Sequence, residues 1–142
     1  MQKETEVSWE QVTEMCKSIC EIAKLMNIDA VIGIKRGGAI PAGIISYILN
    51  KELHIIEPKE QDIISYANLI NVYKVLIVDD IVDTGRTMKT VNELINKYTK
   101  PYNVYYASLY VRADITQFLP HIFTKTCTLS DGYIRFPWEV NK

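Results

Sequence analysis

Short apolar runs alternate with segments of helical periodicity along this chain, and that order restricts the possible folds more than any other feature. Residues 12–26 place apolar side chains at helical spacing, and Ser8 with Gln11 forms a predicted capping box in front of them. Further helices are predicted over 38–50 and 86–98, and strands over 28–34, 53–57, 63–67, 72–80, 103–111 and 122–129. Strands that alternate with helices predict an α/β fold, in which a doubly wound, mainly parallel sheet is flanked by helices.

The bulk properties of the chain fit one domain that spans residues 1–142. Apolar residues make up 48% of the sequence, charged residues make up 23%, and the net charge is −1. These values give no reason to expect a nucleic-acid or membrane partner, and no apolar run approaches the roughly 20 residues of a membrane span. The polar N-terminus is unlike a signal peptide, and three cysteines with two histidines do not suggest a disulfide framework or a zinc site. We therefore expect a cytoplasmic protein.

The run VLIVDDIVDTGRT (75–87) leads from a buried strand into a helix. Asp79 and Asp80 follow the apolar residues, and two adjacent carboxylates are tolerable where a cation or sugar hydroxyls share the site. Asp83 to Thr87 then open the helix with unpaired backbone N–H groups, a glycine and two hydroxyls, which together predict a phosphate cradle. Ribose 5-phosphate matches this layout. The alternative is that Asp83 only caps the helix and that the aspartate pair is a solvated strand end.

A second loop, Lys35-Arg36-Gly37-Gly38, also lies between a predicted strand and a predicted helix. It is not a Walker loop, because no Gly-Lys-Ser/Thr sequence follows. Taken alone, the loop is either an ordinary turn or an anion site. Beside the phosphate cradle it suggests a second anionic group, about the size of pyrophosphate.

Three segments resemble motifs of the type I phosphoribosyltransferases. VLIVDDIVDTGRT resembles the signature that binds phosphoribosyl pyrophosphate, and IGIKRGGAIPAG (32–43) resembles the pyrophosphate loop. DGYIRFPWE (131–139) is similar to the end of bacterial xanthine–guanine phosphoribosyltransferases, in which an aromatic residue stacks on the purine. The resemblance spans most of the chain and implies the type I fold with a short C-terminal hood.

The resemblance also implies a role for each matching residue. Asp79 and Asp80 would hold the ribose hydroxyls, and one of them, which we assign as Asp80 with Asp79 as the alternative, would also meet Mg²⁺ directly or through water. Asp83 would assist proton transfer at the purine. The residues implied to bind the phosphate groups and the purine are Lys35, Arg36 and Gly37 (pyrophosphate), Thr84, Gly85, Arg86 and Thr87 (5-phosphate), and Arg112, Tyr133 and Ile134 (purine).

Three features depart from the family pattern. Arg112 stands where the family has a lysine that contacts the 6-oxo group, so that a point charge is replaced by a fork of donors. Arg86 occupies a cradle position that is usually small, and its side chain either folds over the phosphate or points to solvent. The segment 65–75 is much shorter than the loop that closes over the reaction in family members. An altered lid, or a cover supplied by another chain, follows.

The implied function is that of an enzyme, a purine phosphoribosyltransferase of nucleotide salvage. It would transfer ribose 5-phosphate from phosphoribosyl pyrophosphate to a 6-oxopurine, with Mg²⁺ as cofactor, and would form a homo-oligomer (dimer or tetramer). The alternatives are a phosphoribosyltransferase for another nucleobase and a regulator that binds phosphoribosyl pyrophosphate without turnover. Asp79, Asp80 and Asp83 are all present, which favours the enzyme, and a net charge of −1 leaves an RNA-binding regulator without an obvious basic face.

Overall fold

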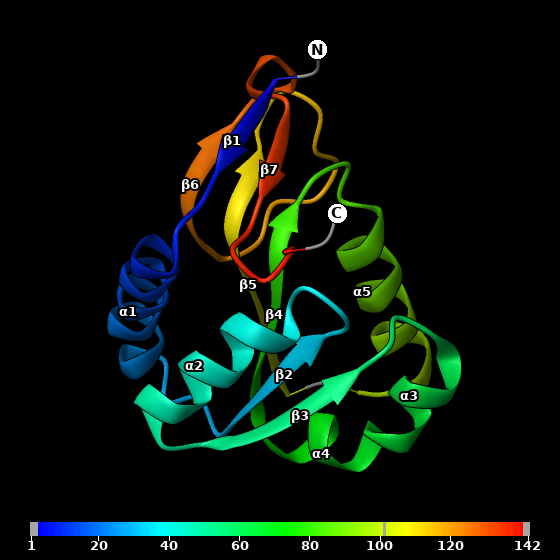
Figure 1. Ribbon diagram of the computed structural model, residues 1–142. Helices are drawn as coiled ribbons and strands as arrows, with labels where there is room; N and C mark the ends of the chain where they lie inside the picture. Colours follow the sequence, from blue (N-terminus) through cyan, green and yellow to red (C-terminus); the bar gives the residue numbers. More distant parts are fainter. Residues whose placement is uncertain (1–2, 101, 141–142) are drawn as a thin grey trace.

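A five-stranded parallel sheet forms the centre of the protein, whose computed structural model describes residues 3–100 and 102–140 (Figure 1). Its strands are β2 (Ala30–Ile34), β3 (Glu52–Ile56), β4 (Lys74–Val82), β5 (Asn103–Arg112) and β6 (Ile122–Cys127). They lie side by side in the order β3-β2-β4-β5-β6, and every pairing is parallel. The predicted mainly parallel sheet is confirmed.

Helices cover both faces of this sheet (Figure 1). They are α1 (Trp9–Leu25), α2 (Ala39–Leu49), α3 (Glu60–Ser65), α4 (Ala67–Val72) and α5 (Arg86–Tyr98). In β4, Leu76 and Val78 belong to the core shared with α1 and α2, whereas Val75 and Ile77 belong to the core shared with α3, α4 and α5. Because alternate strand residues point to opposite faces, these near-continuous apolar strands are what a sheet buried on both sides requires.

Two of the predicted helix starts are confirmed in detail. At the start of α1, the backbone N–H of Gln11 donates to Ser8 Oγ at 3.1 Å, and the N–H of Ser8 donates to Gln11 Oε1 at 2.8 Å. The capping box therefore satisfies two N–H groups that would otherwise lack a partner. Helix α5 has the predicted bounds and follows Gly85, whose φ of 89° lies in the left-handed region that glycine adopts without strain.

The prediction of a strand over 63–67 is wrong, because α3 ends at Ser65, α4 begins at Ala67, and Tyr66 is the turn between them. Ile63 of α3 and Ile70 of α4 are fully buried, whereas Ile64 is 52% exposed. Asp62 also accepts a hydrogen bond at 2.6 Å from the N–H of Glu57 and ties the first turn of α3 to the end of β3. Periodicity alone does not separate a short apolar strand from a short helix.

Strand β4 is shifted two residues along the chain from the predicted 72–80. It begins at Lys74 and continues to Val82, and Ile81 pairs with Tyr110 of β5. Asp79 and Asp80 therefore lie within the strand, three residues or fewer from its end, and not at the point where it leaves the sheet.

The two chain ends form a second, two-stranded parallel sheet of β1 (Glu4–Glu6) and β7 (Tyr133–Arg135), after a 3-10 turn, η1 (Leu129–Asp131). Figure 1 shows β1 and β7 side by side near the carboxyl ends of β5 and β6. This sheet is the predicted C-terminal hood. The strand β1 was not predicted, because Glu-Thr-Glu carries no apolar pattern.

The strand order places a topological switch point between β2 and β4, since the chain turns back there from β3 toward β4. In open α/β sheets, ligands bind outside the carboxyl ends of the strands at such a point. The loops that leave these two strands are Lys35-Arg36-Gly37-Gly38 and Asp83-Thr84-Gly85, so the fold brings both predicted anion loops to one place.

Candidate active site

Asp79 and Asp80 form the centre of the candidate site, and their carboxylates face two different cavities. Asp79 lines a small cavity at the start of α5, whereas Asp80 lines a larger one that reaches the hood. Asp79 Oδ1 accepts from the N–H of Asp80 at 2.8 Å, and Asp80 Oδ1 accepts from the N–H of Ile81 at 2.7 Å. These bonds hold both side chains beside the main chain.

The electrostatics of the pair are unfavourable without a ligand. Burial raises the pKa of Asp79 well above its ordinary value, and the neighbouring Asp80 carboxylate adds to that shift. Burial also raises the pKa of Asp80, and the negative charge of Glu139 contributes in the same direction. A cation or several hydroxyl donors at this point would therefore stabilise the two charges.

The small cavity has the size and lining of a phosphate cradle. Its volume is about 70 Å³, and it is lined by Asp79, Ile81, Val82, Asp83, Thr84, Gly85, Arg86, Thr87 and Met88. A Cβ at Gly85 would lie 2.7 Å from the backbone nitrogen of Phe118, so this turn requires glycine for space as well as for its φ. Arg86, Thr87 and Met88 of the first turn of α5 line the cavity, and the N–H of Arg86 donates to Thr84 Oγ1 at 3.3 Å. The first turn of a helix carries N–H groups without intrahelical partners, and these can bind an anion.

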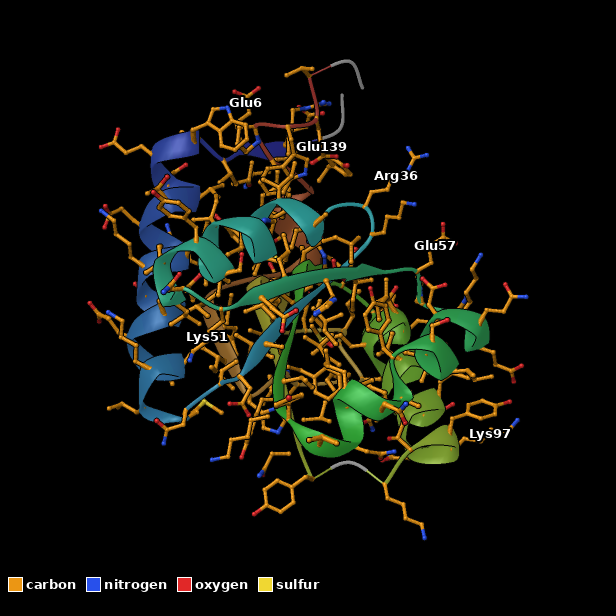
Figure 2. All side chains as sticks on the ribbon, turned by 90° about the horizontal axis from the view of Figure 1, so that it is seen from below. Glu6, Arg36, Lys51, Glu57, Lys97 and Glu139 are labelled. Carbon is orange, nitrogen blue, oxygen red and sulfur yellow. The ribbon has the colours of Figure 1, made fainter. Side chains whose placement is uncertain are left out.

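The loop after β2 packs directly against the aspartate pair. A Cβ at Gly37 would overlap the Asp80 carboxylate, and a Cβ at Gly38 would overlap the backbone oxygens of Val78 and Ile34. The two glycines thus allow the loop to approach β4, and the Lys35–Arg36 peptide bond within it is cis. Figure 2 shows Arg36 pointing outward from this loop. Lys35 Nζ forms an exposed ion pair with Glu57 Oε1 at 3.4 Å.

The larger cavity, of about 510 Å³, joins this loop to the hood. It is lined by Arg36, Gly37, Ile40, Asp80, Tyr133, Trp138, Glu139 and Val140. Tyr133 is 44% exposed, and its hydroxyl donates to a carboxylate oxygen of Glu139. The other Glu139 carboxylate oxygen accepts from the N–H of Phe136 at 2.8 Å. A flat aromatic face, a cation and a carboxylate therefore share one cavity.

Arg112 connects the site to the hood in a way that the sequence did not predict. Its Nε donates to Asp83 at 2.8 Å, while Nη1 donates to the carbonyl of Thr128 at 2.5 Å and Nη2 to that of Gly132 at 3.1 Å. The Arg112 side chain is 6% exposed and that of Asp83 is 55% exposed. The buried Arg112 guanidinium thus links Asp83, after the end of β4, to the turns before Tyr133. We call this set of three hydrogen bonds the Arg112 strut.

The structure brings together most of the residues that the sequence singled out. These residues either line one of the two cavities or, in the case of Arg112, bond to a residue that does. They are Asp79, Asp80, Asp83, Arg36, Gly37, Thr84, Gly85, Arg86, Thr87, Arg112 and Tyr133. Lys35 does not line either cavity, and the side chain of Ile134 is buried in the core, while its backbone pairs with β1.

Ile40, Trp138 and Glu139 line the larger cavity and were not assigned as site residues. Trp138 and Glu139 belong to the tail motif FPWE, which was the signal that pointed to them.

A magnesium ion would have few protein ligands here. No group of three or more His, Cys, Asp or Glu side chains within 3–100 and 102–140 could hold a metal. The carboxylate chemistry of Asp80 still fits Mg²⁺, which binds proteins through one or two carboxylates together with substrate phosphates and water. Asp80 also shares its cavity with the glycine loop, where a pyrophosphate would lie.

The fold and the site define an α/β protein with a candidate sugar-phosphate site at the switch point of its sheet. A model of the phosphoribosyl transferase domain matches residues 8–116. The chain belongs to this family and is a phosphoribosyltransferase.

Individual relatives agree with this assignment. The chain is 26% identical to the xanthine-guanine phosphoribosyltransferase of Chromohalobacter salexigens, over 94% of this chain and 83% of that protein. The crystal structure of purine phosphoribosyltransferase from Pyrococcus horikoshii Ot3 is 25% identical, with a TM-score of 0.81 over 99% of this chain and 96% of that chain. The transcriptional regulator GfcR of Thermoplasma acidophilum is 26% identical over 70% of this chain and 59% of that protein. In the described part of this chain, no helix is long and apolar enough to cross a membrane.

Proposed function

We propose that this protein transfers ribose 5-phosphate from phosphoribosyl pyrophosphate to a 6-oxopurine and releases a nucleoside monophosphate and pyrophosphate. The observation that carries the proposal is that adjacent carboxylates, Asp79 and Asp80, line two different cavities. The small cavity of about 70 Å³ suits the 5-phosphate, and the cavity of about 510 Å³ has room for pyrophosphate beside Arg36 and a purine beside Tyr133.

The proposed reaction breaks the bond between ribose C1 and the pyrophosphate oxygen and forms a bond between C1 and a purine nitrogen. Positive charge develops on the ribose ring, and Asp79 and Asp80, held within β4 by their bonds to the main chain, stabilise it. Mg²⁺, bound at Asp80, would supply positive charge for the departing pyrophosphate. Arg36 and the Gly37 amide bind that group from the other loop. Asp83 accepts the proton that the purine gives up.

Arg112 supports Asp83 in this scheme. Asp83 is an exposed carboxylate that would otherwise rotate freely, and a bond of 2.8 Å from a buried guanidinium fixes one of its oxygens. The resemblance assigns Arg112 to the 6-oxo group of the purine. The three hydrogen bonds of its guanidinium support a positioning role in addition.

The experiment that tests the proposed function is a nucleotide assay over a panel of bases. The protein is incubated with Mg²⁺, phosphoribosyl pyrophosphate and one of guanine, xanthine, hypoxanthine, adenine or uracil, and products are separated by chromatography. We expect nucleotides from the 6-oxopurines in preference to adenine and uracil. Nucleotide formed mainly from adenine or uracil would move the proposal to another nucleobase.

A second candidate is a regulator that binds phosphoribosyl pyrophosphate without turnover, as the similarity to GfcR suggests. Binding in calorimetry, together with no nucleotide from any base in the panel, would favour it. Asp83 favours the enzyme, because a protein that only binds phosphoribosyl pyrophosphate needs Asp79 and Asp80 for the ribose but no proton acceptor. With a net charge of −1 and pI near 6.1, we expect neither a nucleic-acid partner nor a basic binding face. We further propose a cytoplasmic location, where phosphoribosyl pyrophosphate is available.

We also propose that the chain forms a homo-oligomer through α2 and β3. Helix α2, AIPAGIISYIL, is apolar all round, and such a helix is normally buried on all sides. Here Tyr47 is 88% exposed, and Leu53 and Ile55 of the edge strand β3 are 41% and 36% exposed beside it. Tyr47→Arg should therefore reduce the mass measured by light scattering to that of a smaller species, whereas Tyr102→Arg, at a 73% exposed tyrosine elsewhere, should not. A monomeric parent protein would contradict this proposal.

A further inference from the structure

The N-terminal strand β1 is bonded to the segment that carries the base-stacking residue. Glu4, Thr5 and Glu6 stand opposite Tyr133, Ile134 and Arg135 in the parallel pairing. The N–H of Tyr133 donates to the carbonyl of Lys3 at 3.1 Å, and the N–H of Val7 donates to the carbonyl of Arg135 at 2.9 Å. These bonds join the first residues of the chain to the wall of the larger cavity.

Two further contacts tighten this junction. Thr5 Oγ1 donates to the carbonyl of Asp131 at 3.1 Å. A Cβ at Gly132 would overlap the backbone of Lys3, so the turn before Tyr133 closes directly onto β1. The φ of Gly132 is 71°, in the left-handed region, and this is a second reason for glycine at this position. The position of the Tyr133 backbone therefore depends on β1.

The side chains continue the connection through Arg135. Its Nη2 donates to Glu4 Oε1 at 2.7 Å and its Nε donates to Glu4 Oε2 at 3.1 Å, which makes a forked ion pair. Its Nη1 donates to the carbonyl of Glu139 at 3.3 Å, and its guanidinium carbon lies 5.7 Å from the centre of the Tyr133 ring. The Tyr133 hydroxyl donates to the Glu139 carboxylate. Glu4, Arg135, Tyr133 and Glu139 thus form one connected chain that ends in the cavity.

We propose that Glu4 is a positioning residue for nucleobase binding, which acts through Arg135 on the orientation of the Tyr133 ring. This inference rests on the proposed function, because it takes Tyr133 as the surface on which the base stacks. Glu4 does not line either cavity of the site, so it acts without touching the substrate. A fixed ring loses less side-chain freedom when the base arrives, and the base therefore binds more tightly.

The alternative is that the Glu4–Arg135 pair only stabilises the hood. The two roles differ in kinetics. A positioning residue alters the KM for the nucleobase and leaves the KM for phosphoribosyl pyrophosphate and kcat nearly unchanged. A residue that only stabilises the fold lowers the unfolding temperature and leaves all three constants of the folded protein unchanged.

Glu4→Gln removes the charge and keeps the shape, and Glu6→Gln is the matched control, since Glu6 is an exposed glutamate on the same strand (Figure 2). We expect Glu4→Gln to raise the nucleobase KM about threefold, in keeping with the modest strength of an exposed pair. We expect Glu6→Gln to match the parent protein. An unchanged nucleobase KM in Glu4→Gln, or an equal rise in Glu6→Gln, would overturn the inference.

A double-mutant cycle tests the route through Arg135. Because the effect of Glu4 passes through Arg135, the change in nucleobase KM from Glu4→Gln should vanish when it is made in Arg135→Gln. Additive changes would show that Glu4 acts by another route and would contradict the proposal. Nucleotide formation by the parent protein distinguishes failure of the proposed function from failure of the inference about Glu4. If it forms no nucleotide from any base, the proposed function is wrong, and if it turns over while the cycle is additive, only the inference is wrong.

Discussion

Arg112→Lys separates two roles for the residue that joins Asp83 to the hood. The guanidinium makes three hydrogen bonds from a side chain that is 6% exposed, whereas a lysine ammonium reaches at most one or two of the same acceptors. A lost buried hydrogen bond to a charged group costs about 1.5–3 kcal/mol. Asp83 is 55% exposed, so water replaces much of its share.

We therefore expect Arg112→Lys to lower the free energy of unfolding by about 2 kcal/mol, chiefly from one unsatisfied carbonyl in the hood. For a chain of this length, that corresponds to a fall in melting temperature of about 6–8 °C. Circular dichroism measures the melting curve, and the control is Arg86→Lys at an exposed arginine in the cradle, which should shift the curve by less than about 1 °C.

Kinetics then distinguish the strut from a direct contact with the purine. If Arg112 mainly holds Asp83 and the hood, Arg112→Lys should lower kcat, because the proton acceptor is less well placed. The reasoning is refuted if Arg112→Lys melts with the parent protein and raises only the nucleobase KM. In that case the guanidinium leaves its three partners when substrate binds, and the role implied by the family resemblance is the correct one.

The remaining predictions concern the base surface, the proton acceptor and a buried thiol. Tyr133→Ala should raise the nucleobase KM about tenfold, since stacking on an aromatic ring contributes roughly 1–3 kcal/mol; a loss of stability with an unchanged KM would leave Tyr133 as packing only. Asp83→Asn should lower nucleotide formation about 10²-fold while calorimetry still detects binding of phosphoribosyl pyrophosphate. Equal losses of binding and turnover would leave Asp83 as only the structural partner of Arg112. Burial raises the pKa of Cys16 to about 12 in the folded state, against about 9 when exposed. The protonated Cys16 thiol contributes fully to stability below pH 9, and this contribution is lost as the pH rises. The free energy of unfolding should therefore fall by about 2 kcal/mol between pH 9 and 11. Cys16→Ala should flatten that decline, and an unchanged slope would contradict it.

The parts of this molecule that the sequence predicted are those whose causes are local. The bounds of α5 follow from Gly85 and the apolar spacing behind it, and the capping box of α1 needs only Ser8 and Gln11. The two anion loops were predicted from their own glycines, hydroxyls and charges, and parallel strands then bring their ends together.

The parts that were missed depend on distant neighbours. Strand β1 is extended because β7 offers it backbone partners, and nothing in Glu-Thr-Glu announces that pairing. The bond between Arg112 and Asp83 joins residues 29 positions apart, and it required knowing that β5 lies beside β4 with both carboxyl ends at one edge. Helices α3 and α4 stand where a strand was predicted. Each turns one apolar residue, Ile63 or Ile70, into the core, while Ile64 remains 52% exposed.

The variant Thr87→Val tests whether the 5-phosphate occupies the small cavity. Thr87→Val removes one hydroxyl from the cavity lining, and we expect it to weaken phosphoribosyl pyrophosphate more than the nucleobase. This variant accompanies the central assay as its internal check on the phosphate end of the site.

The most direct measurement of the central claim is nucleotide formation from guanine, phosphoribosyl pyrophosphate and Mg²⁺, followed with adenine in parallel. We predict guanosine monophosphate and pyrophosphate in equal amounts, at a rate well above that with adenine, and loss of product on removal of Mg²⁺ by a chelator. Binding of phosphoribosyl pyrophosphate without product from guanine, xanthine or hypoxanthine would contradict the account.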